Sequence, residues 1–479
     1  MDLTLQSALD LARASSFRVQ QLHLGIERQR HQLRAERAGL KSRVELSFTM
    51  PQFSSISQHQ WNSTLGRNEL VREDTRMWQA EVSLRQPVIL FGFPTNGYLS
   101  LNNRMYRYSQ IEDETDITYY NRYYARYEQP IFQPNQLRND LEEAELDLEN
   151  AELEYQDDVV ELLSGIAREY YGLLDIAYDR VIYQQQVTQL EQAAELARTR
   201  VAADSGRSLE ATQVQVALAN ARERLQSARS AYRLAASRLK QRLGLQERDS
   251  LVVDPGLHVA PLSLDLDAAV QYAMTLPPRM RFLGIRQQRD QIALQGVKAR
   301  NAFRMNLDLT YGREMQDEAV RELWSQPSNT YTVGIRGYLP IWDWGARRER
   351  IEAQRVSMRL TELQIDDTRR QIEANVRNLV QSALEYQQRA QAMEENLKLS
   401  NEISTVTATQ YQEGRATVLD LLQAFDREAA TAGNFLEAFL GYRRTLIELG
   451  EATYYDFETS VPITERYGLR TNGAAEEER

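Results

Sequence analysis

A sustained heptad pattern constrains this chain more than any other feature of its sequence. No proline occurs between Pro134 and Pro255, and apolar residues recur there with spacings of three and four. Such spacing places an apolar seam along a helix and requires a coiled-coil partner. The residues that form this pattern are Leu137, Leu141, Ala144, Leu148, Ala151 and Tyr155, then Tyr183, Val187, Leu190, Ala194, Ala197 and Val201, and finally Val214, Leu218, Ala221, Leu225, Ala228, Tyr232, Ala235 and Leu239.

A short turn divides this stretch into two predicted helices, 135–203 and 209–243. Gly206 suits a left-handed helix end, and Ser208 suits the cap of the next helix. At the standard helical rise the first helix would be roughly 100 Å long and the second roughly half that length. A further amphipathic helix is predicted over 4–43. Laid in line, the two shorter helices would flank the long one over its whole length.

The same layout occurs twice in the chain. Leu264–Ala269 echoes Leu3–Ala8, and a second proline-free stretch covers 341–461. In it we predict helices over 265–302, 345–412 and 416–450, with Gly414 equivalent to Gly206 and Gly450 to Gly244. The sequence therefore predicts two structural repeats, 1–249 and 264–459, with a linker at 250–263. The tail, 460–479, is predicted to be disordered.

Between the helices lie segments in which apolar and polar residues alternate. We predict strands over 44–50, 78–88, 97–108 and 117–131 in the first repeat and over 305–313 and 329–341 in the second. About ten residues is the length of a tilted strand that crosses a bilayer. Aromatic residues crowd these segments, as at a membrane interface; we name Trp78, Tyr119, Tyr123, Tyr127, Trp342 and Trp344. A soluble, half-buried sheet with an aromatic core explains the alternation equally well.

Composition excludes several classes of function. The net charge of -11 argues against nucleic-acid binding, which needs a surplus of Lys and Arg. There is no cysteine, and the four histidines form no metal-ligand spacing. Neither a G-x-S-x-G motif nor a phosphate-binding loop is present. We therefore predict that the protein is not an enzyme and binds neither a cofactor nor a metal. A soluble coiled-coil scaffold is the alternative.

The sequence also bears on the membrane question. It contains no apolar run long enough for a transmembrane helix, so we expect no such helix. Met1–Thr4 leads directly into an amphipathic helix, and we expect no signal peptide in this chain. A trimmed exported protein and a cytosolic protein both start in this way.

Two pairs of motifs, with the duplication, resemble the TolC family of outer-membrane efflux and secretion channels. Pro340-Ile341-Trp342-Asp343-Trp344-Gly345-Ala346-Arg347 is similar to the family's strand-to-helix signature, and Gln129–Pro134 is a degraded copy of it. Tyr411–Ala424 is similar to the family's tip turn. The resemblance covers roughly residues 3 to 455.

This resemblance implies a fold and a set of partners. The fold would be mainly helical with a membrane β-barrel, in which the duplicated helix–strands–long helix–helix units of three chains form a periplasmic α-helical tunnel. A barrel shared by the protomers of this homotrimer would also remove open sheet edges. The chain would lie in outer-membrane lipid and export small molecules or proteins. It would work with a periplasmic adaptor and an inner-membrane transporter, in a tripartite efflux or type I secretion system.

One departure concerns the number of strands. The offset between the repeats falls from 261 at the first helices to 210 at Pro130 and Pro340, so the first repeat holds 51 additional residues. We interpret 97–108 and 117–131 as an added hairpin. The prediction is six strands per protomer and eighteen in the trimer, where the family pattern is four and twelve. The alternative keeps four strands per protomer and leaves the added hairpin outside the membrane.

The resemblance also implies the functional residues. A constriction is expected at the tip, where Asp420 matches a family acidic position and Gln423 replaces a second one. Tyr411 matches a tyrosine that latches the closed mouth, with ordinary coiled-coil packing as the alternative, and Arg415 lies one place before the family's arginine. A ring of Asp420 would attract cations; the alternative is a helix N-terminal charge that complements the dipole. Opening would move residues 345–450 away from the other hairpin. The adaptor would dock on Ser205, Gly206, Arg207, Ser208, Glu413, Gly414, Arg415 and Ala416.

Overall fold

The structure is a computed structural model that describes residues 3–91, 93–110, 117–203, 208–246, 248–249, 251–253, 257 and 259–469. Contacts divide the chain into two compact units. The helical unit comprises Met1–Ile26, Ala151–Leu283 and Leu363–Arg479, and the sheet unit comprises Glu27–Asn150 and Gly284–Glu362. These units do not follow the predicted repeats, 1–249 and 264–459, because each unit takes equivalent parts of both repeats.

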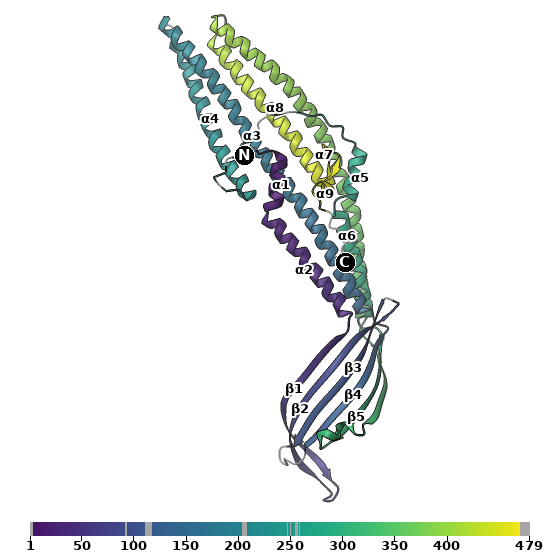
Figure 1. Cartoon of the computed structure of the whole chain (residues 1–479). Helices are drawn as coiled ribbons and strands as arrows, with labels where there is room; N and C mark the ends of the chain where they lie inside the picture. Colours follow the sequence, from purple (N-terminus) through teal and green to yellow (C-terminus); the bar gives the residue numbers. More distant parts are fainter. Residues whose placement is uncertain are drawn as a thin grey trace. The chain divides into compact units, whose positions relative to one another are not determined.

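The sheet unit is built on one antiparallel sheet whose six strands follow chain order (Figure 1). They are β1 (Arg43–Asn62), β2 (Arg67–Leu90), β3 (Phe93–Gln110), β4 (Ile117–Ile131), β5 (Arg304–Asp317) and β6 (Ser328–Tyr338). The added hairpin, β3–β4, pairs with β2 on one side and with β5 on the other. The hairpin is thus an integral part of the sheet. The edge strands of the sheet are β1 and β6.

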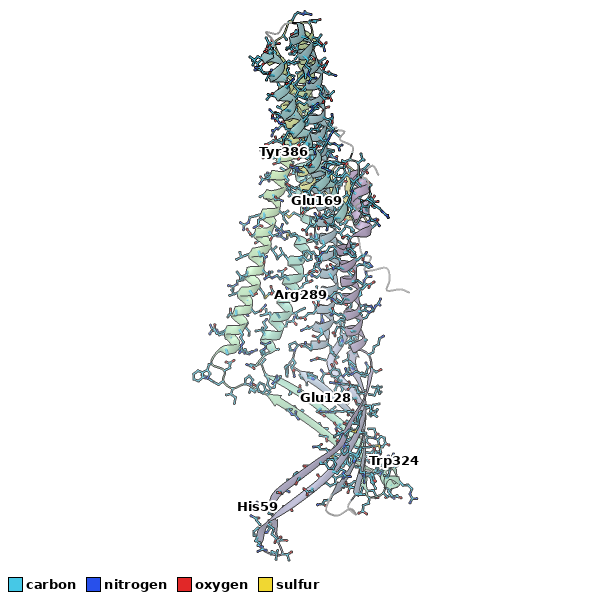
Figure 2. All side chains as sticks on the ribbon, turned by 90° about the vertical axis from the view of Figure 1, so that its left-hand side faces the viewer. His59, Glu128, Glu169, Arg289, Trp324 and Tyr386 are labelled. Atoms are coloured by element: carbon cyan, nitrogen blue, oxygen red, sulfur yellow. The ribbon has the colours of Figure 1, made fainter. Side chains whose placement is uncertain are left out.

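Several predicted strand bounds need correction. The predictions 44–50 and 78–88 are too short, since β1 and β2 continue through a polar hairpin whose far end carries His59 (Figure 2). A register shift between Thr49 and Gln52 breaks the alternation that sequence analysis relied on. β3 and β5 also exceed the predicted 97–108 and 305–313. β6 ends at Tyr338, short of the predicted 341, because Pro340 has no amide for the ladder.

The two faces of the sheet differ in chemistry. In the observed register Leu46 pairs with Val82, and Leu309 pairs with both Tyr127 and Val333, so these residues share one face. We call this the apolar face; it also carries Val44, Phe48, Leu84, Leu101, Tyr311, Tyr331 and Ile335, all of which are exposed. An exposed apolar surface of this extent suits hydrocarbon better than water.

The opposite, polar face holds a network of charged and hydroxyl groups. Glu81 forms an ion pair with Arg104 at 2.9 Å and accepts a hydrogen bond from the Tyr124 hydroxyl at 2.6 Å. Arg126 likewise pairs with Asp308 on the neighbouring strand β5. These charges are therefore matched within the sheet, and the face is suited to a water-filled interior.

Gly312 on β5 permits a close approach to β4. A Cβ at this position would lie 2.5 Å from the carbonyl oxygen of Tyr123 and 2.7 Å from the Cβ of Tyr124. The backbone could not move aside without disturbing the ladder between these two strands. At Gly334 on β6 the nearest atom would be the Asp308 carbonyl oxygen at 3.9 Å, which is ordinary contact.

The helices largely match the prediction, with two breaks that it missed. They are α1 (Leu5–Ser15), α2 (Phe17–Gly39), α3 (Gln136–Ala203), α4 (Ser208–Arg242), α5 (Leu266–Thr275), α6 (Arg279–Ala299), α7 (Ala346–Gln412) and α8 (Val418–Thr453). The predicted helix 4–43 is interrupted at Ser16, and 265–302 is interrupted at Pro277-Pro278. Proline disfavours a helical residue before it and lacks the amide that an interior position needs.

The C-terminal ends of α4 and α8 also differ from each other. Gly244 has a left-handed φ of 69°, as a helix-ending glycine should. Gly450 does not end α8 as predicted, because the helix continues to Thr453 and Tyr454 takes the left-handed conformation with φ 55°. α7 and α8 also begin at 346 and 418, slightly later than the predicted 345 and 416.

Within the helical unit, α3 lies beside α4 and α8 beside α7, and α4 is also in contact with α8 (Figure 1). An apolar cluster buries the heptad positions Val187, Leu190 and Ala194 of α3 and Val214, Ala221 and Leu225 of α4, together with Tyr411 of α7 and Val418, Leu421 and Phe425 of α8. The α7–α8 pair is equally close, since a Cβ at Gly441 would meet the Tyr386 ring at 2.4 Å. We refer to α3–α4 as the first hairpin and to α7–α8 as the second hairpin.

The predicted disorder of the tail is wrong for residues 460–469. This segment forms β8 (Val461–Pro462), which pairs with β7 (Tyr455–Asp456), and then α9 (Ile463–Arg466). Tyr467 and Leu469 are buried in the largest apolar cluster, together with Leu3 and Leu9, and these apolar contacts hold the segment in place. Residues 470–479 lie outside the described part of the chain.

The strand-to-helix signature has a clear local role in the sheet unit. The carboxylate of Asp343 accepts hydrogen bonds from the amides of Gly345 and Arg347, at 3.0 and 2.9 Å. Arg347 in turn donates to the carbonyl oxygen of Lys298 in the last turn of α6. The signature therefore caps the start of α7 and the end of α6 with two side chains.

We predict that Gly312→Ala lowers the yield of folded, heat-modifiable protein in the outer-membrane fraction, because the added Cβ meets the backbone of β4. Gly334→Ala is the matched control and should behave like the unchanged protein. The measurement is the shift in gel mobility on heating. Equal yields for the two variants would show that β4 and β5 are not packed as described.

Candidate gate and docking surface

The turn of the second hairpin depends on Gly414. This residue has φ 76°, and the amides of Arg415 and Ala416 donate to the carbonyl oxygen of Gln410 at 2.8 and 3.2 Å. A left-handed residue at this point satisfies carbonyls that the end of α7 would leave unpaired. Arg415 forms an ion pair with Glu413 within the turn. In the other turn, Ser205, Gly206 and Arg207 lie outside the described residues. α4 begins at Ser208, so this residue is the first of the helix and not its cap.

Tyr411 is 1% exposed and packs in an apolar cluster with Val418 and Leu421 of α8 and Val214 of α4. The guanidinium carbon of Arg200 on α3 lies 4.3 Å from the centre of the Tyr411 ring. The same guanidinium donates a hydrogen bond to the Tyr411 carbonyl oxygen. Arg200 therefore joins the ends of the two hairpins by a cation–π contact and a hydrogen bond.

Asp420 takes part in a capping box at the start of α8. Its carboxylate accepts hydrogen bonds from the hydroxyl and the amide of Thr417, at 2.6 and 3.0 Å. The Thr417 hydroxyl accepts one from the Asp420 amide in return. These bonds, the side-chain bond first, lower the pKa of the Asp420 carboxyl, so it is ionised at neutral pH. Asp420 and Gln423 are both exposed. The observed local role of Asp420 is thus that of a capping residue.

A polar layer joins the two hairpins further from the turns. Glu428 of α8 is 6% exposed, and its carboxylate accepts hydrogen bonds from the amides of Gln185 and Gln189 of α3, at 2.7 and 3.0 Å. Beside it, Gln186 donates to Asp426 at 3.0 Å. A buried carboxylate is tolerated only when such donors replace water. We call Glu428, Asp426, Gln185, Gln186 and Gln189 the polar layer.

Sequence analysis missed both Arg200 and the polar layer. Arg200 stands in the last turn of α3, where a cation complements the helix dipole, and this position is unremarkable for an arginine. Glu428 and its partners are far apart in the chain. Only the helix register brings them together, although a Glu at a heptad position of α8 is a signal that could have been noticed.

The aromatic residues predicted at the membrane interface fall into two places. Trp78, Tyr119, Tyr123 and Tyr127 lie on the apolar face of the sheet. The indole of Trp324, from the β5–β6 connection, donates to the Tyr123 hydroxyl at 2.7 Å (Figure 2). Trp342 and Trp344 lie at the strand-to-helix junction, 71% and 88% exposed, with their rings 5.5 Å apart and nearly perpendicular.

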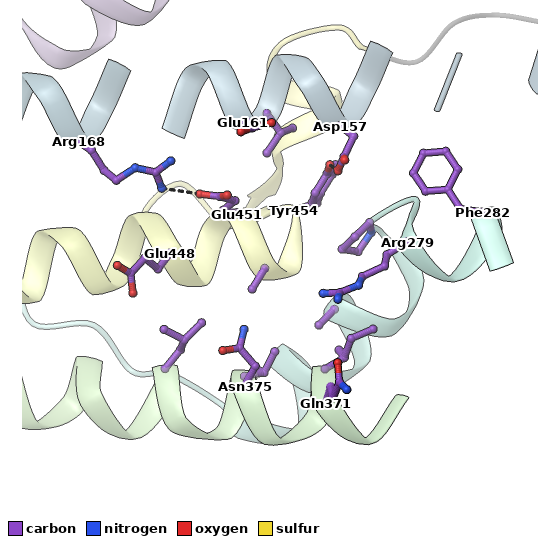
Figure 3. A pocket seen from close by; sticks show the side chains of 17 residues that line it. Asp157, Glu161, Arg168, Arg279, Phe282, Gln371, Asn375, Glu448, Glu451 and Tyr454 are labelled. Carbon is purple, nitrogen blue, oxygen red and sulfur yellow. Dashed lines mark hydrogen bonds and ion pairs between the residues drawn. The ribbon is translucent and has the colours of Figure 1, made fainter. Parts of the chain in front are cut away.

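The helical unit also contains a cavity of about 780 Å³ (Figure 3). Its lining mixes charges that pair with one another: Arg168 donates to Glu451 at 2.6 Å, and the Tyr454 hydroxyl donates to Asp157 at 2.5 Å. Burial, followed by the bond to Asp157, raises the pKa of Tyr454 above its usual range. Among the described residues no group of His, Asp and Glu is arranged to hold a metal ion.

None of the helices in the described ranges combines the length and the apolar character needed to cross a membrane.

The comparisons with known proteins identify the family. The family model described as outer membrane efflux protein matches residues 99–245 and 283–453. The chain belongs to the outer membrane efflux protein family. A search of curated proteins found no significant match. The resemblance to TolC-like channels is thereby confirmed, and the alternative of a soluble coiled-coil scaffold is wrong.

Solved structures show the same fold at low sequence identity. The outer membrane protein VceC from Vibrio cholerae is 14% identical, with 95% of each chain covered and a TM-score of 0.66. The CmeC outer membrane channel of Campylobacter jejuni is 12% identical, with 98% of this chain and 90% of that chain covered and a TM-score of 0.66. The MtrE outer membrane channel of Neisseria gonorrhoeae, in its open state, is 14% identical over 94% and 88%, with a TM-score of 0.61.

This efflux protein is therefore a channel of the outer membrane with a periplasmic tunnel, and it is not an enzyme. Its fold is mainly helical with an antiparallel sheet, as predicted. The functional residues of such a protein are those that shape, close and position the conduit, and the hairpin ends described above are the candidates.

We predict that Arg200→Met raises the open fraction of the channel. Losing the cation–π contact and the hydrogen bond to Tyr411 removes about 2 kcal/mol, which corresponds to about a 30-fold shift between closed and open states. Arg198→Met is the control, because Arg198 pairs only with Glu195 of its own helix among the ion pairs of the described residues. Conductance in planar bilayers measures the effect, and equal conductance of both variants would contradict a latch at Arg200.

Proposed function

We propose that three copies of this chain form one conduit that carries small molecules or proteins out of the cell. The main support for this proposal comes from the sheet, whose apolar face is exposed while its polar face holds paired charges. Its two edge strands, β1 and β6, have no neighbour among the described residues on their outer sides. Three such sheets, joined edge to edge, would close a barrel of eighteen strands without open edges.

The proposed conduit is the outer part of a tripartite efflux or type I secretion system. Its inner partners would be a periplasmic adaptor and an inner-membrane transporter, since family members work in such assemblies. Purified protein should give trimers and steady ion conductance in planar bilayers. A monomeric protein that conducts no ions would overturn the proposal.

Opening would move the second hairpin away from the first. The contacts that oppose this movement are the Arg200–Tyr411 pair at the turns, the polar layer around Glu428, and the apolar cluster in which Val214 of α4 packs with Val418 and Leu421 of α8. The first two contacts are polar and form between α3 and α7 or α8, so water can replace them when the hairpins separate, whereas the apolar cluster resists separation. The apolar seam inside each hairpin would stay intact during the movement.

Asp420 would add negative charge at the constriction, since three copies bring three exposed carboxylates to one level. We predict that Asp420→Asn weakens cation selectivity and cation block in planar bilayers while trimers persist. Asparagine keeps an acceptor for Thr417, whereas Asp420→Ala also removes the cap, which is worth about 1 kcal/mol. If Asp420→Asn conducts like the unchanged channel and only Asp420→Ala differs, the carboxylate acts as a cap alone.

The adaptor would dock on the two turns, Ser205 to Ser208 and Glu413 to Ala416. We predict that Gly414→Val abolishes export while trimers still reach the outer membrane, since a β-branched residue is strained at φ 76°. Gly433→Ala, on α8 with no atom within 4 Å of the added Cβ, is the control. Export is measured in cells that carry the partner proteins. Unimpaired export by Gly414→Val would place the docking surface elsewhere.

A further inference from the structure

The polar face of the sheet changes in composition at the added hairpin, β3–β4. The even-numbered residues of both strands lie on this face, because Arg104 is paired with Glu81 of β2 and with Arg122 of β4. Five of these residues are half-buried tyrosines, whereas the other four described strands add only Tyr338 to the face. We call the five the tyrosine row: Tyr98, Tyr106, Tyr108, Tyr120 and Tyr124.

The tyrosine row extends along the whole hairpin. Tyr98 and Tyr108 are ten residues apart on β3, which is roughly 30 Å at the rise of a strand. This length is close to the hydrocarbon thickness of a bilayer. Tyr106 and Tyr120 lie opposite each other on the two strands, and their rings stack with 4.5 Å between the centres and 18° between the planes. Aromatic rings are therefore present from one end of the hairpin to the other.

Neighbouring charged groups hold several of these rings in place. The Tyr120 hydroxyl donates a hydrogen bond to Glu314 at 2.7 Å, as the Tyr124 hydroxyl does to Glu81. At the other end of the row, the guanidinium carbon of Arg85 lies 3.8 Å from the centre of the Tyr98 ring. Because these contacts already restrict the rings, a ligand that packs on them loses little affinity to ordering the side chains.

The charges around the tyrosine row are matched. Each arginine on this side of the added hairpin forms an ion pair with a carboxylate of β2 or β5: Arg104 with Glu81, Arg122 with Glu314, and Arg126 with Asp308. A chain of phosphates binds through cations that are not already neutralised, so this surface is poorly suited to a polyanion. The paired groups still offer hydrogen-bond donors and acceptors to an uncharged molecule.

Apolar solutes are also a poor match for this surface. None of the even-numbered residues of 98–108 and 118–128 is aliphatic; apart from the tyrosines they are Ser, Asn, Thr, Arg and Glu. Sugars fit the combination better. A sugar ring has a face of C–H groups, which packs on an aromatic ring, and a rim of hydroxyls that donate and accept hydrogen bonds.

We propose that the tyrosine row binds uncharged oligosaccharides as they pass through the barrel. The inference rests on the proposed conduit and names a class of substrate that it transports. Successive sugar units would pack on successive rings, while the ion pairs beside the rings exchange hydrogen bonds with the sugar hydroxyls. Several weak sites in a row allow movement, whereas one tight site would hold the substrate. The hairpin that sets this chain apart from the four-strand pattern would thus also set its substrate.

Single-channel current in planar bilayers tests the proposal. Maltohexaose and the hexamer of N-acetylglucosamine are added separately to the unchanged full-length channel. At least one of these sugars should interrupt the current reversibly, more often at higher concentration. Polyethylene glycol of the same hydrodynamic size controls for blocking by volume alone and should give no discrete interruptions. Conducting channels that neither sugar interrupts more than the glycol does would overturn the inference. Protein that conducts no ions would instead contradict the proposed conduit.

Two neighbouring positions provide matched variants. Tyr106→Leu should shorten the sugar-dependent interruptions about fivefold, because it removes one stacking surface. Tyr106→Phe keeps the ring and should resemble the unchanged channel. The control is Tyr119→Leu, since Tyr119 precedes Tyr120 in the chain but lies on the apolar face. Equal interruptions in Tyr106→Leu and Tyr119→Leu would overturn the role of the row. Interruption by short polyphosphate and by neither sugar would also overturn it, in favour of a polyanion. If Tyr106→Leu fails to fold, the comparison of sugar with glycol on the unchanged channel still decides.

Discussion

Everything in this protein depends on helices that must bury more than one side. α3 is the clearest case, because it contacts α4 through its apolar seam and α8 through the polar layer. A helix in water gains most of its stability from packing an apolar side, so a long helix with two such sides requires neighbours on both. Long helices that need neighbours on more than one side can line a conduit when several of them pack together.

The contacts inside each hairpin differ in chemistry from the contacts between the two hairpins. Inside each hairpin the contacts are apolar, and a shift of one helix past the other would expose Val187, Leu190 or Leu225 to water. Between the hairpins the contacts include Arg200 with Tyr411 and Glu428 with two glutamines, which lose less on exposure to water. Water can replace these polar contacts when the hairpins separate, whereas the apolar cluster of Val214 with Tyr411 and Leu421 resists separation.

The sequence was sufficient for the parts of the fold that follow a simple period. Heptads located the long helices, alternation located all six strands, and β4 matches its predicted bounds of 117–131. Where tertiary contacts decide, prediction failed: the polar hairpin of β1 and β2 is ordered by its ladder, and Tyr467 is ordered by burial. The break at Pro277-Pro278 was visible in the sequence and was overlooked. Arg200 and Glu428 acquire their roles only through residues far away in the chain, so local patterns did not reveal them.

The central claim is that three chains share one lumen, which six strands from each of them continue through the membrane. Single-particle imaging of the protein in lipid discs tests it most directly. The account predicts a three-fold particle with an eighteen-stranded barrel and a single tunnel. A monomeric particle, or a barrel of twelve strands with β3 and β4 outside it, would contradict the account.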